Sequence, residues 1–244
     1  LRAVLSFLVV LVIIRQALLG HYENIFTGVL TLILFGVPLL IDRKMGIDIP
    51  PTLEAIILCF IFAAEILGEI NSFYTIIPYW DTMLHTINGF LMAAIGIALV
   101  DIINRSENFA MELSPLFVAV VAFCFSMTIG VLWEFFECSM DLFFAKDMQK
   151  DTFVTVINSV ALNPQGLNIV EHIPIESLMV NGEDWLAKYG GYLDIGLLDT
   201  MKDLFVNFIG AVVFSIIGFF YVKNQGKGNF AKKFIPTVKE DNQE

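Results

Sequence analysis

Six long apolar runs dominate the sequence, and they restrict its fold more than any other feature. A helix needs roughly 20 mostly apolar residues to cross about 30 Å of hydrocarbon, and each run approaches or reaches that length. Hydrophobic residues make up 57% of the chain and charged residues 16%, against roughly 45–50% and about 25% in soluble domains. The sequence therefore predicts an all-α fold, a polytopic membrane helical bundle of about six transmembrane helices. The runs cover residues 4–19, 25–41, 53–73, 82–103, 115–136 and 204–222.

Basic residues in the short loops predict how the bundle is oriented, because they concentrate on the cytoplasmic side. Arg43 and Lys44 follow the second run, Arg105 follows the fourth, and several lysines follow the sixth, whereas the loops after the first and third runs contain no Lys or Arg. An even number of spans leaves both termini on the same side. We therefore expect a multi-pass protein of the cytoplasmic membrane with both termini in the cytoplasm. The second run contains Pro38, where we expect a kink or a partly re-entrant segment.

This topology divides the chain into four parts. Residues 1–144 carry the first five helices, 145–200 form an extracytoplasmic loop or cap, 201–223 form the sixth helix, and 224–244 form a cytoplasmic tail. Turn signals punctuate the loop, and we expect it to fold over the outer mouth of the bundle with one or two short helices. The polar, basic tail is expected to be disordered. The turn signals are Asn163-Pro164-Gln165-Gly166, Asn181-Gly182 and Gly190-Gly191.

Ionisable residues gather at one end of runs three to six. They recur at spacings of three or four residues, which place them on one face of a helix. Under the predicted topology they all lie near the extracytoplasmic end, while stretches 91–100, 117–125 and 211–220 near the other end contain no charge. The residues are Glu65 and Glu69 in the third run, Asp81 and His85 in the fourth, Glu134, Glu137 and Asp141 in the fifth, and Asp199 and Asp203 before the sixth.

So many carboxylates in one layer cannot all stay ionised unless protons or a cation compensate their charge. Carboxylates with one imidazole suit a divalent ion such as Mg²⁺, Mn²⁺, Fe²⁺ or Zn²⁺, and bundles with di-metal sites use Glu and His at similar spacings. We therefore predict a divalent metal site formed by these nine residues, with His85, Glu134 and Asp203 in catalytic roles. The simpler interpretation places the carboxylates in the solvated headgroup region, with Trp80 and Trp133 in the aromatic belt.

Three spaced motifs carry a family resemblance. They resemble bacterial inner-membrane proteins of the YjdF type and, more distantly, VanZ-like membrane proteins, over runs three to six. VanZ-like chains typically have Asp-Lys before the His and Glu-x-x-Gln, and this chain departs from both patterns. The resemblance implies a bacterial cytoplasmic membrane and no particular activity. The motifs are Trp80-Asp81-x-x-x-His85-x-x-x-Gly89, Glu134-x-x-Glu137 and Asp199-x-x-x-Asp203-x-x-x-Asn207-x-x-Gly210.

Three classes of function fit these features. The first is a metal-dependent membrane enzyme, such as a hydrolase, acting at the outer leaflet on a lipid or lipid-linked phosphate. The second is a divalent-cation transporter, and the third is a non-catalytic membrane protein with a structural metal. Polar residues reach only halfway through the predicted bundle and no repeat is evident, which disfavours a transporter. The sequence also lacks the catalytic motifs HExxH and GxSxG, which counts against an enzyme. The net charge of −11 disfavours nucleic acid as a partner. Asn207 and Gly210 also suit a close approach of helices.

Overall fold

The computed structural model describes residues 1–104 and 113–238. Arg105, on which part of the orientation argument rests, lies outside the described residues. The chain divides into two compact units, which we describe separately. The first comprises Leu1–Gly130 and Asp203–Glu244, and the second comprises Val131–Lys202.

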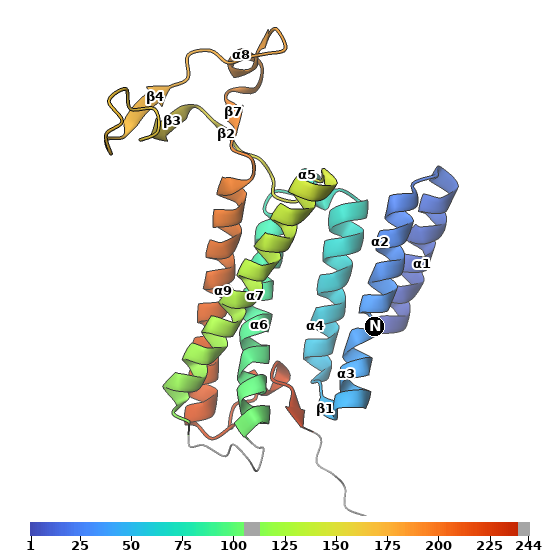
Figure 1. The fold of residues 1–244 in the computed structure, drawn as a ribbon. Helices are drawn as coiled ribbons and strands as arrows, with labels where there is room; N and C mark the ends of the chain where they lie inside the picture. The colour runs from blue at the N-terminus through green and yellow to red at the C-terminus, as the bar shows by residue number, and fades with distance from the viewer. Residues whose placement is uncertain (105–112, 239–244) are drawn as a thin grey trace, which may run out of the picture. The chain divides into compact units, whose positions relative to one another are not determined.

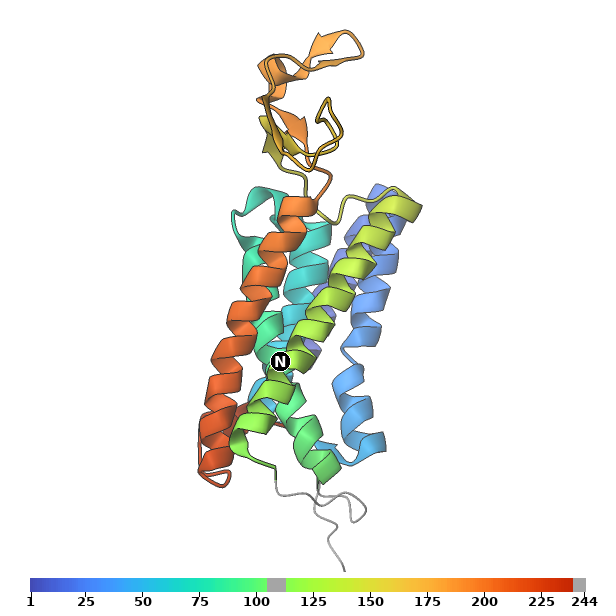
Figure 2. The ribbon, with the colours of Figure 1, turned by 60° about the vertical axis from the view of Figure 1, so that its left-hand side comes forward.

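Five helical segments in the described part of the chain are long and apolar enough to cross a membrane. In the first unit, successive segments run in alternating directions (Figures 1 and 2). The predominantly helical membrane fold is therefore confirmed, but five such segments are found where six were predicted. They are α1 (Arg2–Leu19), α2 with α3 (Tyr22–Lys44), α6 (Trp80–Asn104), α7 (Pro115–Phe144) and α9 (Leu197–Lys223).

The second apolar run is broken where its sequence predicts a kink. Helix α2 (Tyr22–Leu34) ends before Phe35 and Gly36, and α3 (Val37–Met45) begins just after them. Pro38 is the second residue of α3, where its missing N–H costs no hydrogen bond.

The third apolar run forms two consecutive helical segments of different type. Helix α4 (Pro51–Ile61) is followed directly by the π-helix η1 (Phe62–Ile70). Two side chains support the π-segment: the indole of Trp80 donates to the Ala63 carbonyl at 3.3 Å, and the Asn71 amide donates to the Ile66 carbonyl at 2.7 Å. Trp80 also packs edge-on against Phe73 of the short helix α5 (Phe73–Ile76). Trp80 therefore has a specific structural role besides any place in an aromatic belt.

Helices α6 and α9 approach each other through two glycines. A Cβ on Gly89 would lie 2.1 Å from the Asn207 carbonyl oxygen, and one on Gly210 would lie 2.1 Å from the Thr86 carbonyl oxygen. The close approach predicted for Asn207 and Gly210 is thus confirmed. Ser126 of α7 adds the third helix, because its hydroxyl donates to the Gly89 carbonyl at 2.7 Å.

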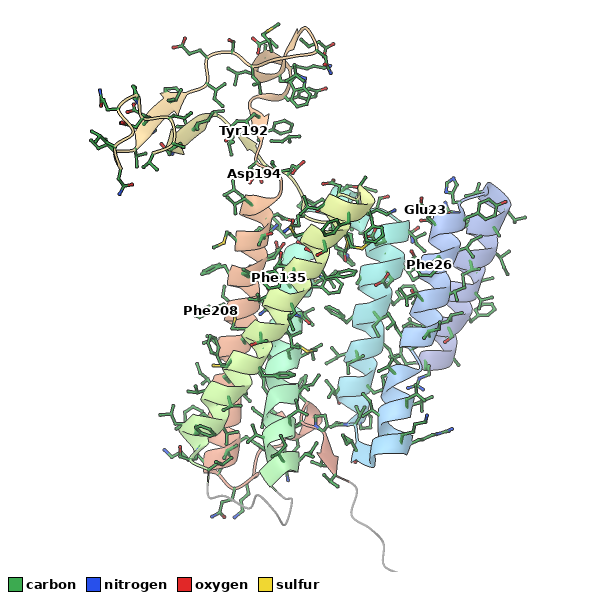
Figure 3. All side chains as sticks on the ribbon, viewed as in Figure 1. Glu23, Phe26, Phe135, Tyr192, Asp194 and Phe208 are labelled. Carbon is green, nitrogen blue, oxygen red and sulfur yellow. The ribbon has the colours of Figure 1, made fainter. Side chains whose placement is uncertain are left out.

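Below this contact, the centre of the first unit is filled by apolar side chains. Small residues of α6 pack with Phe214 of α9, Val118 and Ala122 of α7, and the C-terminal segment. Other large side chains of this unit project outward: Phe26 of α2 and Phe208 of α9 are 69% and 42% exposed (Figure 3). Such surfaces are expected where helices contact lipid.

The C-terminal segment corrects the expectation of a disordered tail. After α9, the chain turns back, and Ala231, Phe234 and Ile235 are buried in the same core. The Phe234 ring lies 5.2 Å from that of Phe90 and 5.9 Å from that of Phe214, centroid to centroid. Strand β8 (Thr237–Val238) then pairs antiparallel with β1 (Ile47–Asp48). The tail is therefore an integral part of the unit up to Val238; residues 239–244 lie outside the described residues.

The second unit corrects the purely α-helical prediction, because it contains short antiparallel strand pairs besides the single short helix α8 (Trp185–Tyr189). The Asn181-Gly182 turn signal lies between β5 and β6, and both residues have positive φ, 51° and 86°, as a type I′ turn requires. The pairs are β2 (Phe153–Val154) with β7 (Tyr192–Leu193), β3 (Val156–Ser159) with β4 (Glu171–Pro174), and β5 (Met179–Val180) with β6 (Glu183–Asp184).

Candidate functional site

Asp81, His85 and Asp203 form a compact cluster in the first unit. Asp81 and His85 lie one turn apart near the start of α6, and the His85 Nε2 atom is 3.4 Å from Asp81 Oδ1. Asp203 comes from α9, and its Oδ2 atom is 3.9 Å from the same Nε2. One donor atom from each residue lies within 4.8 Å of the other two. Residues that are far apart in the sequence thus present two oxygens and one nitrogen to a common point.

The cluster is buried on one side and open on the other. Asp203 is 1% exposed, and the His85 side chain is 8% exposed, but the Asp81 side chain is 23% exposed. Burying charge is costly unless it is compensated. Two carboxylates beside one imidazole, protonated or not, carry a net negative charge, so the cluster is suited to hold a cation.

A polar layer directly below the cluster fixes the register of the helices. Asn207, one turn after Asp203 on α9, accepts a hydrogen bond from the Asn88 amide at 3.2 Å, and its own amide is 3.5 Å from the Ser126 carbonyl. Asn207 is 1% exposed. Gly130 makes room for it, since a Cβ there would lie 2.7 Å from the Asn207 amide nitrogen. This layer joins α6, α7 and α9 one turn from Asp203.

Sequence reasoning missed Asn88 and Ser126, which act in this layer. Asn88 lies three residues after His85, so helical spacing could have found it. Ser126 stands alone in an apolar stretch and carries no comparable signal. Its role depends on the partner carbonyl of Gly89, which belongs to another helix.

Glu65 and Glu69 lie on η1 in the first unit and do not belong to the compact cluster. Four of the predicted ligands lie in the second unit. Glu134 and Glu137 are buried on α7, at 4% and 7% exposure, and Glu137 accepts a hydrogen bond from the Trp133 indole at 2.8 Å. Trp133 therefore has a specific partner, as Trp80 does. Metal binding by Glu65, Glu69, Glu134 and Glu137 stays a prediction.

The carboxylates of Asp141 and Asp199 accept hydrogen bonds from backbone amides in the second unit. The carboxylate of Asp141 accepts from the Met148 and Gln149 amides at 2.6 and 2.9 Å. Asp199 accepts from the Lys150 amide at 2.8 Å and pairs with the Lys202 ammonium at 2.6 Å. These contacts favour a structural role for both carboxylates, and their predicted metal ligation is likewise untested.

Comparison with known proteins gives a family for the chain. The profile of a family described as "predicted membrane protein (DUF2238)" matches residues 1–224, and the chain belongs to this family. No curated protein and no solved structure matches it. The family agrees in kind with the YjdF-type resemblance, whereas nothing in the comparisons supports the more distant VanZ-like one.

Proposed function

We propose that this member of the DUF2238 family is a metal-dependent membrane enzyme, with its centre at Asp81, His85 and Asp203. The observation that carries the proposal is the convergence of one imidazole nitrogen and two carboxylate oxygens from α6 and α9, 3.4 and 3.9 Å apart, around a nearly inaccessible Asp203. Tetrahedral ligands about 2.0–2.2 Å from a metal lie about 3.3–3.6 Å from one another. The observed distances approach that range without any rearrangement of the helices.

The donor set favours a divalent ion of the Zn²⁺, Mn²⁺ or Fe²⁺ type, with Mg²⁺ less suited because it takes oxygen ligands. Three protein ligands leave a position for water, which is typical of catalytic rather than structural metal sites. Asp81 is the most exposed of the three residues, so solvent would reach the site from its side. A bound metal would supply an activated water and polarise a phosphoryl oxygen.

We further propose hydrolysis of a lipid or lipid-linked phosphate. The water oxygen would bond to phosphorus and give up a proton, the bond from phosphorus to the lipid oxygen would break, and the departing oxygen would receive that proton. The catalytic role of Glu134 rests on its sequence motif alone, and its side chain is 4% exposed. The substrate class follows from the membrane location of the donors.

The proposed topology has six spans, with α4 and η1 together forming the third, and both termini in the cytoplasm. The pairing of β8 with β1 supports termini on the basic side, because it holds the C-terminal segment at the loop that follows Arg43 and Lys44. The cluster then lies toward the outer leaflet, and residues 145–196 between α7 and α9 are extracytoplasmic.

The apolar core favours an enzyme over a transporter. On the basic side of the cluster, the space between α6, α7 and α9 is occupied by Ala94, Ile97, Ala122 and Phe214, with Phe234 from the tail. A transport route needs polar groups or broken helices that reach both faces. The buried apolar side chains at this place instead support an enzyme.

Metal analysis of purified protein tests the centre. We expect one equivalent of a divalent metal in the wild type, and loss of the metal in Asp81→Asn, His85→Ala and Asp203→Asn. Asp101→Asn is the matched control, because it removes a carboxylate from the other end of α6. A folded wild type without metal, or an Asp203→Asn variant that keeps it, would overturn the proposed centre.

Phosphate release tests the activity. Proteoliposomes loaded with phosphatidic acid or a polyprenyl diphosphate should release phosphate with the wild type and with Asp101→Asn, but not with Asp203→Asn or Glu134→Gln. A metal-loaded protein that turns over neither probe would refute the enzyme and leave a structural metal. Divalent-cation flux abolished by the same substitutions would establish the transporter instead.

A further inference from the structure

Four lysines and no acidic residue lie at the end of α9 and along the C-terminal segment. Residues 223–238 contain no Asp or Glu, whereas the whole chain carries a net charge of −11. All four lysines are exposed. They form a strongly basic surface of the first unit, which we call the lysine surface. Its members are Lys223, Lys227, Lys232 and Lys233.

The lysines of this surface differ from those of the second unit because they have no acidic partner. The Lys223 ammonium lies 5.7 Å from the centroid of the Phe219 ring, and none of the four lysines forms an ion pair with another described residue. The lysine surface therefore keeps its full capacity to bind an anion. In the second unit, by contrast, Lys150 pairs with Asp147, Lys188 with Glu183 and Lys202 with Asp199.

The C-terminal segment holds these lysines in a folded arrangement. Lys232 and Lys233 belong to the 3-10 helix η2 (Ala231–Lys233), whose first residue is buried in the apolar core. The Lys232 amide donates to the Gly228 carbonyl at 3.2 Å, and β8 ties the end of the segment to β1 (Figure 1). The orientation of α9 in a membrane requires only that basic residues follow it and does not require this fold. A surface that is already ordered loses less entropy when it binds a ligand.

The surroundings of the lysine surface favour the membrane as the source of the anion. The lysines begin at the last residue of α9, a helix long and apolar enough to span the membrane. The ring of Phe230 is 54% exposed among them, and an aromatic ring beside lysines suits the boundary between headgroups and acyl chains. Residues 42–48, which include β1, balance two basic residues against two acidic ones. The excess positive charge therefore belongs to the C-terminal segment.

We propose that the lysine surface binds the headgroups of anionic phospholipids in the adjoining leaflet. Lys232 and Lys233 contact the phosphate groups, and the Phe230 ring enters the membrane boundary beside them. Clusters of about four to eight basic residues directly after a membrane helix recognise anionic lipids in this way. The proposal is independent of the metal centre, because it uses only the end of α9 and the C-terminal segment.

Lipid retention tests the proposal. The full chain is reconstituted in vesicles of phosphatidylglycerol and phosphatidylcholine in equal amounts and extracted in mild detergent, and the retained lipids are counted by mass spectrometry. The wild type should prefer phosphatidylglycerol. Lys232→Gln combined with Lys233→Gln, and Lys227→Gln alone, should lower this preference about fivefold for each lysine removed. Lys232→Arg combined with Lys233→Arg should keep it.

A matched control separates the lysine surface from a general effect of charge. Lys150→Gln combined with Lys188→Gln removes two lysines from the second unit and should leave the preference unchanged. A Lys232→Gln and Lys233→Gln variant with the Tm and the lipid preference of the wild type would overturn the proposal, as would an equal loss in the control. Inorganic phosphate at constant ionic strength should not displace the lipid; displacement would also overturn the proposal and assign the lysine surface to a dissolved anion.

Discussion

Replacing Gly210 with alanine tests whether the α6–α9 contact holds the candidate site together. The added Cβ would lie 2.1 Å from the Thr86 carbonyl oxygen and 2.7 Å from the Phe90 amide nitrogen. Ordinary contact begins near 3.4 Å, so the two backbones must separate by about 1.3 Å. Both obstructing atoms belong to backbone, so no side-chain rotation relieves the clash.

The sign of the effect follows from two opposed contributions. In a helix free of contacts, alanine is favoured over glycine by about 1 kcal/mol. Overpacking in a filled core costs about 1–3 kcal/mol, and a backbone obstacle places Gly210→Ala at the upper end of that range. We therefore expect net destabilisation of about 1–2 kcal/mol and a wider separation of His85 from Asp203, which already lie 3.9 Å apart.

The assay combines thermal unfolding in detergent with a helix–helix distance. Spin labels at Met83 on α6 and Phe205 on α9, which are 40% and 62% exposed, report the separation by pulsed electron paramagnetic resonance. Gly210→Ala should lower the Tm, lengthen this distance and release any bound metal. Gly228→Ala is the control, since the nearest atom to its Cβ would lie at 3.4 Å. An unchanged distance with a Tm equal to or above the wild-type value would refute the close approach.

Three further predictions concern other parts of the chain. Phe234→Ala should lower the Tm markedly, because the Phe234 ring is 8% exposed between Phe90 and Phe214 and such truncations cost about 3–5 kcal/mol. Phe230 is exposed, so Phe230→Ala should change the Tm little. Equal effects of the two substitutions would contradict the buried tail. A cysteine at Asn181 in a cysteine-free chain should be labelled by an impermeant reagent in intact cells, and labelling only after permeabilisation would reverse the orientation. Burial alone would raise the pKa of Asp194, but hydrogen bonds from the Thr152 and Leu198 amides outweigh it and lower this pKa. The ionised Asp194 carboxylate therefore stabilises the second unit above about pH 4, and this stabilisation is lost as the pH falls further. Asp194→Asn should weaken the protease protection of residues 131–202 at neutral pH and make that protection less dependent on acid. Unchanged protection would refute this role.

A few neighbouring residues are enough to predict the features that depend on local order. The pairing of Asp81 with His85, the kink at Pro38 and the turn at Asn181-Gly182 each follow from a few neighbouring residues. The partner of His85 on another helix follows less directly, because Asp203 is 118 positions later in the chain. The motif spacing of Asp199, Asp203 and Asn207 indicates that Asp203 lies on a polar face of its helix, but its distance from His85 depends on how the helices pack.

The missed features have identifiable physical reasons. The π-segment depends on tertiary support from the Trp80 indole, which lies outside the segment. The strands of the second unit are two to four residues long, too short for an alternating pattern to stand out. The prediction of a disordered tail rests on its lysines, but Ala231, Phe234 and Ile235 are buried while Lys232 and Lys233 stay exposed.

The α6–α9 contact links packing to chemistry in one repeated pattern. On α9, Asp203, Asn207 and Gly210 recur at intervals of four and three residues, and each meets α6: Asp203 the His85 side chain, Asn207 the Asn88 side chain, and Gly210 the backbone of Thr86 and Phe90. A slip of one turn would shift the helices by about 5.4 Å and would bring a Cβ against backbone where a glycine now lies. The glycines therefore permit one register, and only that register brings Asp203 to His85. Replacing a ligand and replacing a glycine should therefore affect the stability of the protein differently. Asp203→Asn leaves the helix register intact, whereas Gly210→Ala disturbs it even when every ligand is present.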